Sequence, residues 1–243
     1  MVTKNQIKII AELHQKKYRQ LYNLFIAEGQ KCISELLNSD FELLFLYETE
    51  PIFNDLCFVE KHLISENDLK KMSALTNPNN CLAVFRIKKS DAIIQKNIIV
   101  ALDNVSDPGN LGTIIRLCDW FGIRDLVCSQ STVDLYNPKV VQASMGSLTR
   151  VNVNYLNLQE FLVENTLPVY GTFMNGDNVY KTKLPENAIL LMGNEGNGIS
   201  TEISNHVSKR LSIPRFGDLQ STESLNVATA TAIFLSEFKR SLK

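Results

Sequence analysis

Residues 189–200 have the sequence ILLMGNEGNGIS, an uninterrupted apolar run followed by three glycines within six residues. An apolar run without alternation is typical of a strand that is buried on both faces of a parallel sheet. Glycines directly after such a strand allow the backbone to approach a ligand or another part of the chain closely. Their spacing, GxxGxG, differs from the dinucleotide-binding GxGxxG pattern and from a Walker A loop. The stretch therefore predicts a buried strand and a tight, glycine-rich turn, and it identifies no nucleotide.

Strands and helices alternate on both sides of this stretch, from residue 98 to the end of the chain. The apolar patterns predict strands at 98–102, 125–128, 169–173, 188–192 and 209–213, and helices at 110–121, 138–145, 158–165 and 224–240. Such alternation is typical of a parallel sheet with helices on both faces. Ligands of these sheets bind beyond the carboxyl ends of the strands, where the glycine-rich turn is expected.

Two further loops are expected at the same edge of the sheet. Residues 102–116, LDNVSDPGNLGTIIR, turn at Asp107-Pro108-Gly109 and then begin a helix. Arg116 lies off the apolar stripe of this helix, which leaves two interpretations, a group in the cleft and a surface arginine. The other loop contains Ile213-Pro214 and later Ser224, which is a favourable N-cap for the last helix. Taken singly, none of the three loops assigns a function.

The first 90 residues predict a smaller mixed α/β module, joined to the rest by a polar linker at 88–97. Strands are expected at 23–27, 41–47 and 81–87, with helices at 30–37 and after the N-cap Ser65. The first 31 residues contain six Lys or Arg against two Glu. By charge alone, this excess is typical of a solvated helix face.

Composition limits the class of protein. The chain has 243 residues, of which 44% are hydrophobic and 21% charged, as in globular proteins. A net charge of −1 argues against a protein that coats nucleic acid by bulk charge. No apolar run approaches the roughly 18 residues that span a bilayer, and residues 1–6 do not resemble a secretory signal. Five cysteines without a CxxC pair and three scattered histidines predict a cytoplasmic location and no metal site.

In this order, the three loops closely resemble the SpoU (TrmH-like) family of RNA ribose 2′-O-methyltransferases. The matching motifs are residues 110–116, residues 193–200, and Ile213-Pro214 with residues 224–228. Residues 144–147, SMGS, fit the segment between the first two motifs. Residues 25–29, FIAEG, followed by a helix, resemble an L30e-like substrate-binding domain. The resemblance implies an RNA-binding domain at 1–92 and a catalytic domain at 97–243.

The resemblance also implies a fold, a cofactor and a partner. The fold is the SPOUT fold, an α/β fold with a C-terminal trefoil knot. The cofactor is S-adenosylmethionine, which becomes S-adenosylhomocysteine. Its expected contacts are Met192, Gly193, Asn194, Gly198, Ile213 and Leu225. Enzymes of this family are usually homodimers, and the implied substrate is ribosomal RNA or, alternatively, transfer RNA, with no membrane or metal partner.

The family's catalytic arginine corresponds to Arg116, which acts either as a base or as a clamp on the neighbouring phosphate and the developing alkoxide. A guanidinium is a poor base, because its pKa exceeds about 12. Glu195 is expected to orient Arg116 or the ribose. The remaining expected catalytic residues are Asn110, Ser224 and Asn226. The expected RNA contacts are Lys16, Lys17, Arg19 and Glu28.

Two features of the third loop depart from the family pattern, and two other functions remain open. Six residues separate Gly217 from Ser224, more than the common spacing, and Arg215-Phe216 replaces the usual small or apolar pair after Ile-Pro. The main alternative is a non-catalytic RNA-binding protein with a degenerate SPOUT domain, which a measured cofactor affinity would exclude. The other is a nucleotide-dependent oxidoreductase, whose glycine fingerprint is missing after the first strand of the large sheet.

Overall fold

The computed structural model describes residues 2–54, 56, 60–217 and 224–240. The chain divides into two compact units. The N-terminal unit comprises Met1–Lys89 with Asp134–Thr149, and the C-terminal unit comprises Ser90–Val133 with Arg150–Lys243. None of the helices in the described ranges is long and apolar enough to cross a membrane.

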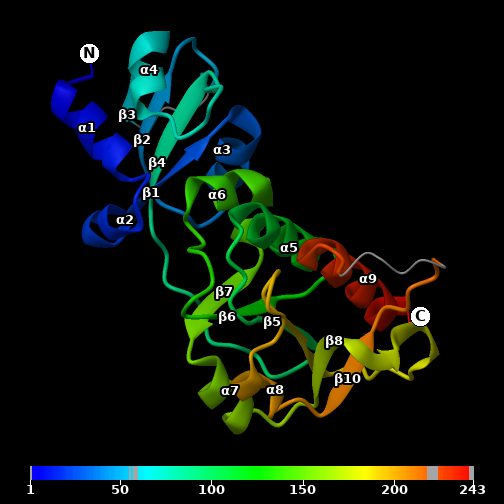
Figure 1. The fold of residues 1–243 in the computed structure, drawn as a ribbon. Helices are drawn as coiled ribbons and strands as arrows, with labels where there is room; N and C mark the ends of the chain where they lie inside the picture. The colour runs from blue at the N-terminus through cyan, green and yellow to red at the C-terminus, as the bar shows by residue number, and fades with distance from the viewer. Residues whose placement is uncertain (1, 55, 57–59, 218–223, 241–243) are drawn as a thin grey trace. The chain divides into compact units, whose positions relative to one another are not determined.

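The N-terminal unit is built around a four-stranded mixed sheet in the order β1-β4-β2-β3, shown in Figure 1. Strand β4 pairs antiparallel with β1 and β2, whereas β2 and β3 are parallel. Its core is apolar and includes Ile26, Tyr47 and Leu82. The elements are α1 (Lys4–Glu12), α2 (Lys16–Tyr22), β1 (Leu24–Glu28), α3 (Gln30–Leu37), β2 (Leu43–Glu48), β3 (Glu60–Leu63), α4 (Glu66–Met72), β4 (Cys81–Arg86), α6 (Pro138–Ser144) and the 3₁₀ turn η1 (Ser147–Thr149).

Residues 134–149 pack in the N-terminal unit, although they follow two strands of the large sheet in the sequence. Tyr136 lies against the ring of Phe25, with 4.6 Å between the ring centroids. Asp134 accepts hydrogen bonds from the guanidinium of Arg19. The structural units are therefore not contiguous in sequence, and the expected functional domains at 1–92 and 97–243 stay a prediction.

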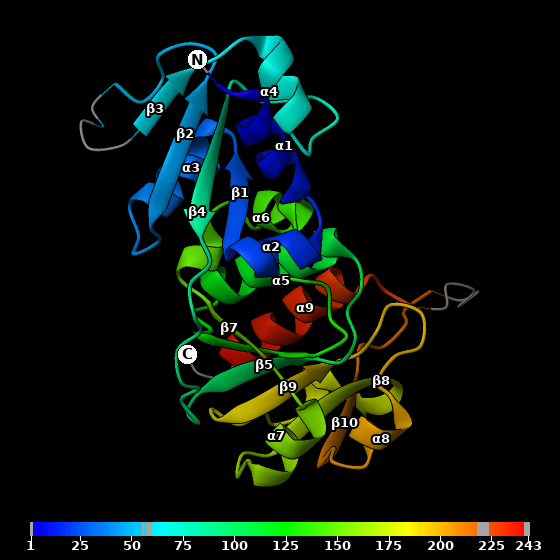
Figure 2. The ribbon, with the colours of Figure 1, turned by 90° about the vertical axis from the view of Figure 1, so that its left-hand side faces the viewer.

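The C-terminal unit contains a six-stranded sheet in the order β10-β8-β9-β5-β6-β7, in which every neighbouring pair is parallel. Helices α5 and α9 cover one face and α7 and α8 the other (Figure 2). The elements are β5 (Ile98–Leu102), α5 (Pro108–Trp120), β6 (Asp125–Ser129), β7 (Asn152–Leu156), α7 (Leu158–Glu164), β8 (Val169–Asn178), the 3₁₀ turn η2 (Val179–Lys181), β9 (Ala188–Met192), α8 (Thr201–Ser204), β10 (Lys209–Ser212) and α9 (Val227–Arg240).

The parallel α/β architecture confirms the fold class expected from the sequence. Every residue of β5 and β9 is buried, as their uninterrupted apolar runs predicted. Strand β7 was not predicted, because this half-buried edge strand has the sequence NVNYL and lacks an apolar run. Strands β8 and β10 approach closely, since a Cβ atom on Gly176 would lie 2.5 Å from the carbonyl carbon of Leu211. The trefoil knot stays a prediction.

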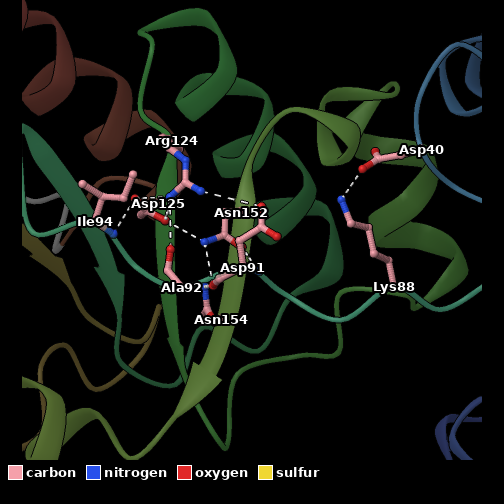
Figure 3. A network of polar contacts seen from close by, with 9 residues as sticks. All are labelled: Asp40, Lys88, Asp91, Ala92, Ile94, Arg124, Asp125, Asn152 and Asn154. Atoms are coloured by element: carbon pink, nitrogen blue, oxygen red, sulfur yellow. Dashed lines mark hydrogen bonds and ion pairs between the residues drawn. The ribbon is translucent and has the colours of Figure 1, made fainter.

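Linker residues 91–94 are held by polar groups of β6 and β7, as Figure 3 shows. The buried carboxylate of Asp125 accepts hydrogen bonds from the amide of Asn152 at 2.7 Å and from the backbone N–H of Ile94 at 3.3 Å. Asn152 also donates to the carbonyl of Asp91 at 3.1 Å. This part of the predicted linker therefore belongs to the C-terminal unit.

Candidate active site

Side chains from three loops form one hydrogen-bonded chain beyond the carboxyl ends of β5 and β9. The amide nitrogen of Asn110, in the first turn of α5, donates to the carboxylate of Glu195 at 3.0 Å. The amide nitrogen of Asn226, directly before α9, donates to the amide oxygen of Asn110 at 2.8 Å. Three of the five predicted catalytic residues are thus in contact. Asn110 connects the other two.

The carboxylate of Glu195 accepts hydrogen bonds from the loop before α5. Besides Asn110, its donors include the backbone N–H groups of Ser106 at 3.4 Å and Asp107 at 3.3 Å, the hydroxyl of Ser106 and the side-chain amide of Asn194. Partial burial alone would raise the pKa of Glu195, but these hydrogen bonds outweigh burial and lower it below the ordinary value. Glu195 is therefore ionised at neutral pH, and it holds the glycine-rich loop against the start of α5.

The lowered pKa of Glu195 predicts acid sensitivity of this contact. A carboxylate whose pKa is lower in the folded than in the unfolded protein stabilises the fold at pH values above its unfolded-state pKa. This stabilisation is lost as the pH falls through the folded-state pKa. At pH 7 we expect Glu195→Gln to lower the free energy of unfolding by about 1 kcal/mol, because the group is partly exposed. The difference in melting temperature between the two proteins should shrink below about pH 4. A difference that is independent of pH would show that the charge contributes nothing.

The glycine-rich loop folds back on itself. Asn194 and Gly198 exchange two backbone hydrogen bonds of 2.9 Å, and the side-chain oxygen of Asn194 accepts from the N–H groups of Gly196 and Asn197. A Cβ atom on Gly193 would lie 2.2 Å from the carbonyl carbon of Gly198. Only glycine fits at position 193, because any side chain would overlap the returning backbone.

Sequence reasoning missed Asp103, which fixes the far end of this loop. Its carboxylate is buried at the end of β5 and accepts a 2.7 Å hydrogen bond from the N–H of Ser200. Its own N–H donates to the carbonyl of Met192. The sequence does contain a signal for this role. Asp103 directly follows an apolar strand, and a carboxylate buried there needs hydrogen-bond donors nearby.

Arg116 lies on the exposed face of α5, two turns after the beginning of the helix. Within the described residues, its guanidinium forms no hydrogen bond or ion pair, and Glu195 binds Asn110 instead. Of the two roles expected for Glu195, a direct contact with Arg116 is absent among the described residues, and orientation of the ribose stays a prediction. An unpaired guanidinium keeps all its donors available for a phosphate or an alkoxide.

The N-cap of α9 also differs from the prediction. The side-chain oxygen of Asn226 accepts from the N–H groups of Ala228 and Thr229 at 3.0 and 3.1 Å, so Asn226 caps the helix. Ser224 lies exposed two residues earlier, and the helix begins at Val227 instead of residue 224. Asn226 suits this position because its side chain makes both contacts. The side-chain oxygen accepts from the first turn of α9, and the side-chain nitrogen donates to Asn110.

The predicted cofactor contacts fit a ligand that is held by backbone groups and apolar side chains. Gly196 and Gly198 leave loop backbone exposed, Leu225 is 48% exposed although apolar, and Ile213 is half-buried. Met192 and Gly193, by contrast, are buried at the end of β9. Exposed loop backbone can form hydrogen bonds with the polar groups of S-adenosylmethionine, and an exposed leucine can contact its flat apolar part. In the described ranges, no three His, Cys, Asp or Glu side chains are grouped so as to hold a metal ion.

The predicted RNA contacts divide into two exposed and two buried residues. Lys16 and Lys17 are exposed at the start of α2. Arg19 is only 2% exposed, and besides Asp134 it binds the carbonyls of Leu13 and His14. Glu28 is 4% exposed. The side chains of Arg19 and Glu28 are therefore used inside the N-terminal unit, and Lys16 and Lys17 are the members of this set that solvent reaches.

Glu28 connects β1 to the segment after α4. Its carboxylate accepts hydrogen bonds from the hydroxyl of Ser73 and from the N–H of Ala74 at 2.8 Å. Burial raises its pKa, and the two hydrogen bonds offset part of that rise. We expect Glu28→Ala to lower the free energy of unfolding by about 1.5–3 kcal/mol, because both donors lose their acceptor. Urea denaturation of the full chain measures this change.

Glu28→Gln is the matched control. It keeps one oxygen acceptor and the side-chain volume, so the loss should be clearly smaller. Equal losses for the two variants would show that charge, and not the acceptor, is what matters.

Comparison with known proteins supports the family resemblance. A model of the SpoU rRNA methylase family matches residues 97–236, more than half of the chain. The chain belongs to the SpoU rRNA methylase family. A second model, an MRM3-like substrate binding domain, matches residues 4–83.

Relatives within the SpoU family match both units. The 23S rRNA (guanosine(2553)-2′-O)-methyltransferase of Bacillus subtilis is 32% identical over 96% of this chain and 95% of its own length. A solved structure of the TrmH family from Porphyromonas gingivalis is 39% identical, covers 99% of both chains and has a TM-score of 0.89. An AdoMet-bound rRNA methyltransferase from Sinorhizobium meliloti is 29% identical, with a TM-score of 0.87 over 100% of this chain and 97% of that one.

Proposed function

We propose that this SpoU-family chain transfers a methyl group from S-adenosylmethionine to the 2′-hydroxyl of a guanosine in 23S ribosomal RNA. One observation carries the proposal. The hydrogen-bonded chain Glu195–Asn110–Asn226 joins the three family motifs at one edge of the sheet, with the exposed Arg116 on the same helix as Asn110. The guanosine and the ribosomal RNA are inferred from the Bacillus subtilis relative, which matches this chain over almost its whole length.

The protein's task in this reaction is to position a hydroxyl and remove its proton. S-adenosylmethionine supplies, when bound, a methyl group on a sulfonium that is already a strong electrophile. Arg116 clamps the phosphate next to the target ribose and stabilises the negative charge that develops on the 2′-oxygen. Asn110 is held by Glu195 and Asn226, so its orientation is set before RNA binds. Leu225, Ile213 and the backbone of residues 193–198 would hold the cofactor, and Ser224 directly precedes Leu225 in the chain.

The N-terminal region, residues 1–92, binds the RNA in this proposal, and residues 97–243 carry the chemistry. Lys16 and Lys17 are the exposed cations of the predicted set, and phosphate contacts by lysine position RNA without reading its sequence. The family resemblance further supports a homodimer in the cytoplasm, and light scattering of the purified protein measures the mass.

Methyl transfer to RNA tests the proposal directly. Labelled S-adenosylmethionine is incubated with total RNA from a strain that lacks this gene, and the digested nucleosides are identified by mass. A single 2′-O-methylguanosine that maps to 23S rRNA is the expected product. A base-methylated product would contradict the ribose assignment. Absence of both transfer and cofactor binding would favour the non-catalytic RNA-binding alternative.

A further inference from the structure

Two exposed aromatic side chains lie together at the carboxyl edge of the large sheet. Tyr180, in the turn η2 directly after β8, is 40% exposed, and Phe216, four residues after β10, is 83% exposed. Their ring centroids are 6.4 Å apart and their planes are inclined by 34°. Strands β8 and β10 end side by side, because Asn178 is paired with Ser212. The rings thus lie at the same edge of the sheet as the glycine-rich loop.

The two rings are accompanied by cations. Lys181 and Lys183 follow Tyr180 and are exposed, and Arg215 precedes Phe216. Neither lysine forms an ion pair with a residue in the described part of the chain. Segments 179–183 and 213–217 contain no acidic residue. Exposed rings next to exposed lysines are the features with which proteins bind single-stranded nucleic acid, since bases stack on the rings while cations contact the phosphates.

We infer that Tyr180 and Phe216 form a stacking platform for an unpaired base of the RNA next to the methylated nucleotide, with Lys181 and Lys183 contacting its backbone. This inference rests on the proposed function, because it assumes an RNA substrate. A second copy of the chain fits less well, since a twofold interface would place the same positive segments against each other. The platform positions RNA and takes no part in the transfer. Arg215-Phe216 is also where the sequence departs from the common family pattern.

Steady-state methyl transfer to an unmodified 23S rRNA transcript tests this role. We expect Phe216→Ala and Tyr180→Ala each to raise the KM for RNA about tenfold, with kcat within about twofold of the wild type. Phe216→Trp should have the KM of the wild type, because tryptophan keeps a stacking surface. The affinity for S-adenosylmethionine should stay unchanged in all variants. Phe216 is so exposed that its replacement does not endanger folding.

Anisotropy of a labelled single-stranded oligouridylate tests the platform without turnover. Binding to Phe216→Ala should be about tenfold weaker than to the wild type. If the wild type binds the oligonucleotide in this way but methylates no RNA, the proposed function fails while the platform stands. An unchanged KM and anisotropy in Phe216→Ala would overturn the platform. The platform would also be overturned if Phe216→Ala weakened only the binding of the cofactor, or if this substitution dissociated a dimer.

Discussion

Replacement of Arg116 by alanine should lower the rate of methyl transfer by about 10²–10⁴-fold while leaving the fold intact. The rate should fall because the clamp on the phosphate and on the developing negative charge is lost. The fold should stay intact because the side chain is exposed on α5 and pairs with no group in the described part of the protein. Loss of an exposed, unpaired side chain changes stability by no more than about 0.5 kcal/mol. Single-turnover transfer to RNA measures the rate, and thermal unfolding measures the stability.

The matched control for this substitution is Lys96→Ala. Lys96 is also an exposed cation, but it precedes β5 and therefore lies at the opposite, amino edge of the sheet. We expect it to transfer methyl groups at the wild-type rate. Affinity for S-adenosylmethionine, measured by calorimetry, should be equal in all three proteins. Turnover by Arg116→Ala close to that of the wild type would show that the active site is assigned to the wrong face of α5.

Replacement of Gly193 by alanine should destabilise the protein by about 2–4 kcal/mol and abolish measurable cofactor binding. The added methyl group would lie 2.2 Å from the carbonyl carbon of Gly198 and 2.3 Å from the nitrogen of Ile199. Both are backbone atoms, so no side-chain rotation relieves the overlap. Opening the loop would break the paired hydrogen bonds between Asn194 and Gly198. Urea denaturation and calorimetric titration with S-adenosylmethionine measure the two effects.

Gly196→Ala in the same loop is the comparison. A Cβ atom there would have its nearest neighbour, the side-chain oxygen of Asn194, at 3.6 Å, an ordinary contact. We therefore expect a change in stability of less than about 0.5 kcal/mol. If the two glycine variants behaved alike, the close return of the backbone at Gly193 would not be what the loop requires.

Local patterns in the sequence predicted most secondary-structure elements and missed those that depend on neighbours. Strands β5 and β9 have the predicted boundaries, because their apolar runs need no partner to be recognised. Strand β3, with the sequence EKHL, has no such run and owes its existence to pairing with β2. Strand β8 continues beyond residue 173 through Asn, Gly and Asp, since its far end pairs with β10 after a register shift.

The sequence by itself determined the class of fold, the order of the three loops and the family, because these depend on periodicity and on motif residues that are close in the chain. The tertiary structure alone decided which polar groups are partners. Asn226 reaches Asn110 across 116 residues of sequence, whereas Glu195 binds Asn110, and Arg116 has no polar partner among the residues that the structure describes. Likewise, Arg19 and Glu28 resemble surface charges until packing encloses them with Asp134 and Ser73. Burial and pairing of a charge depend on segments that are remote in sequence, and no local pattern records them.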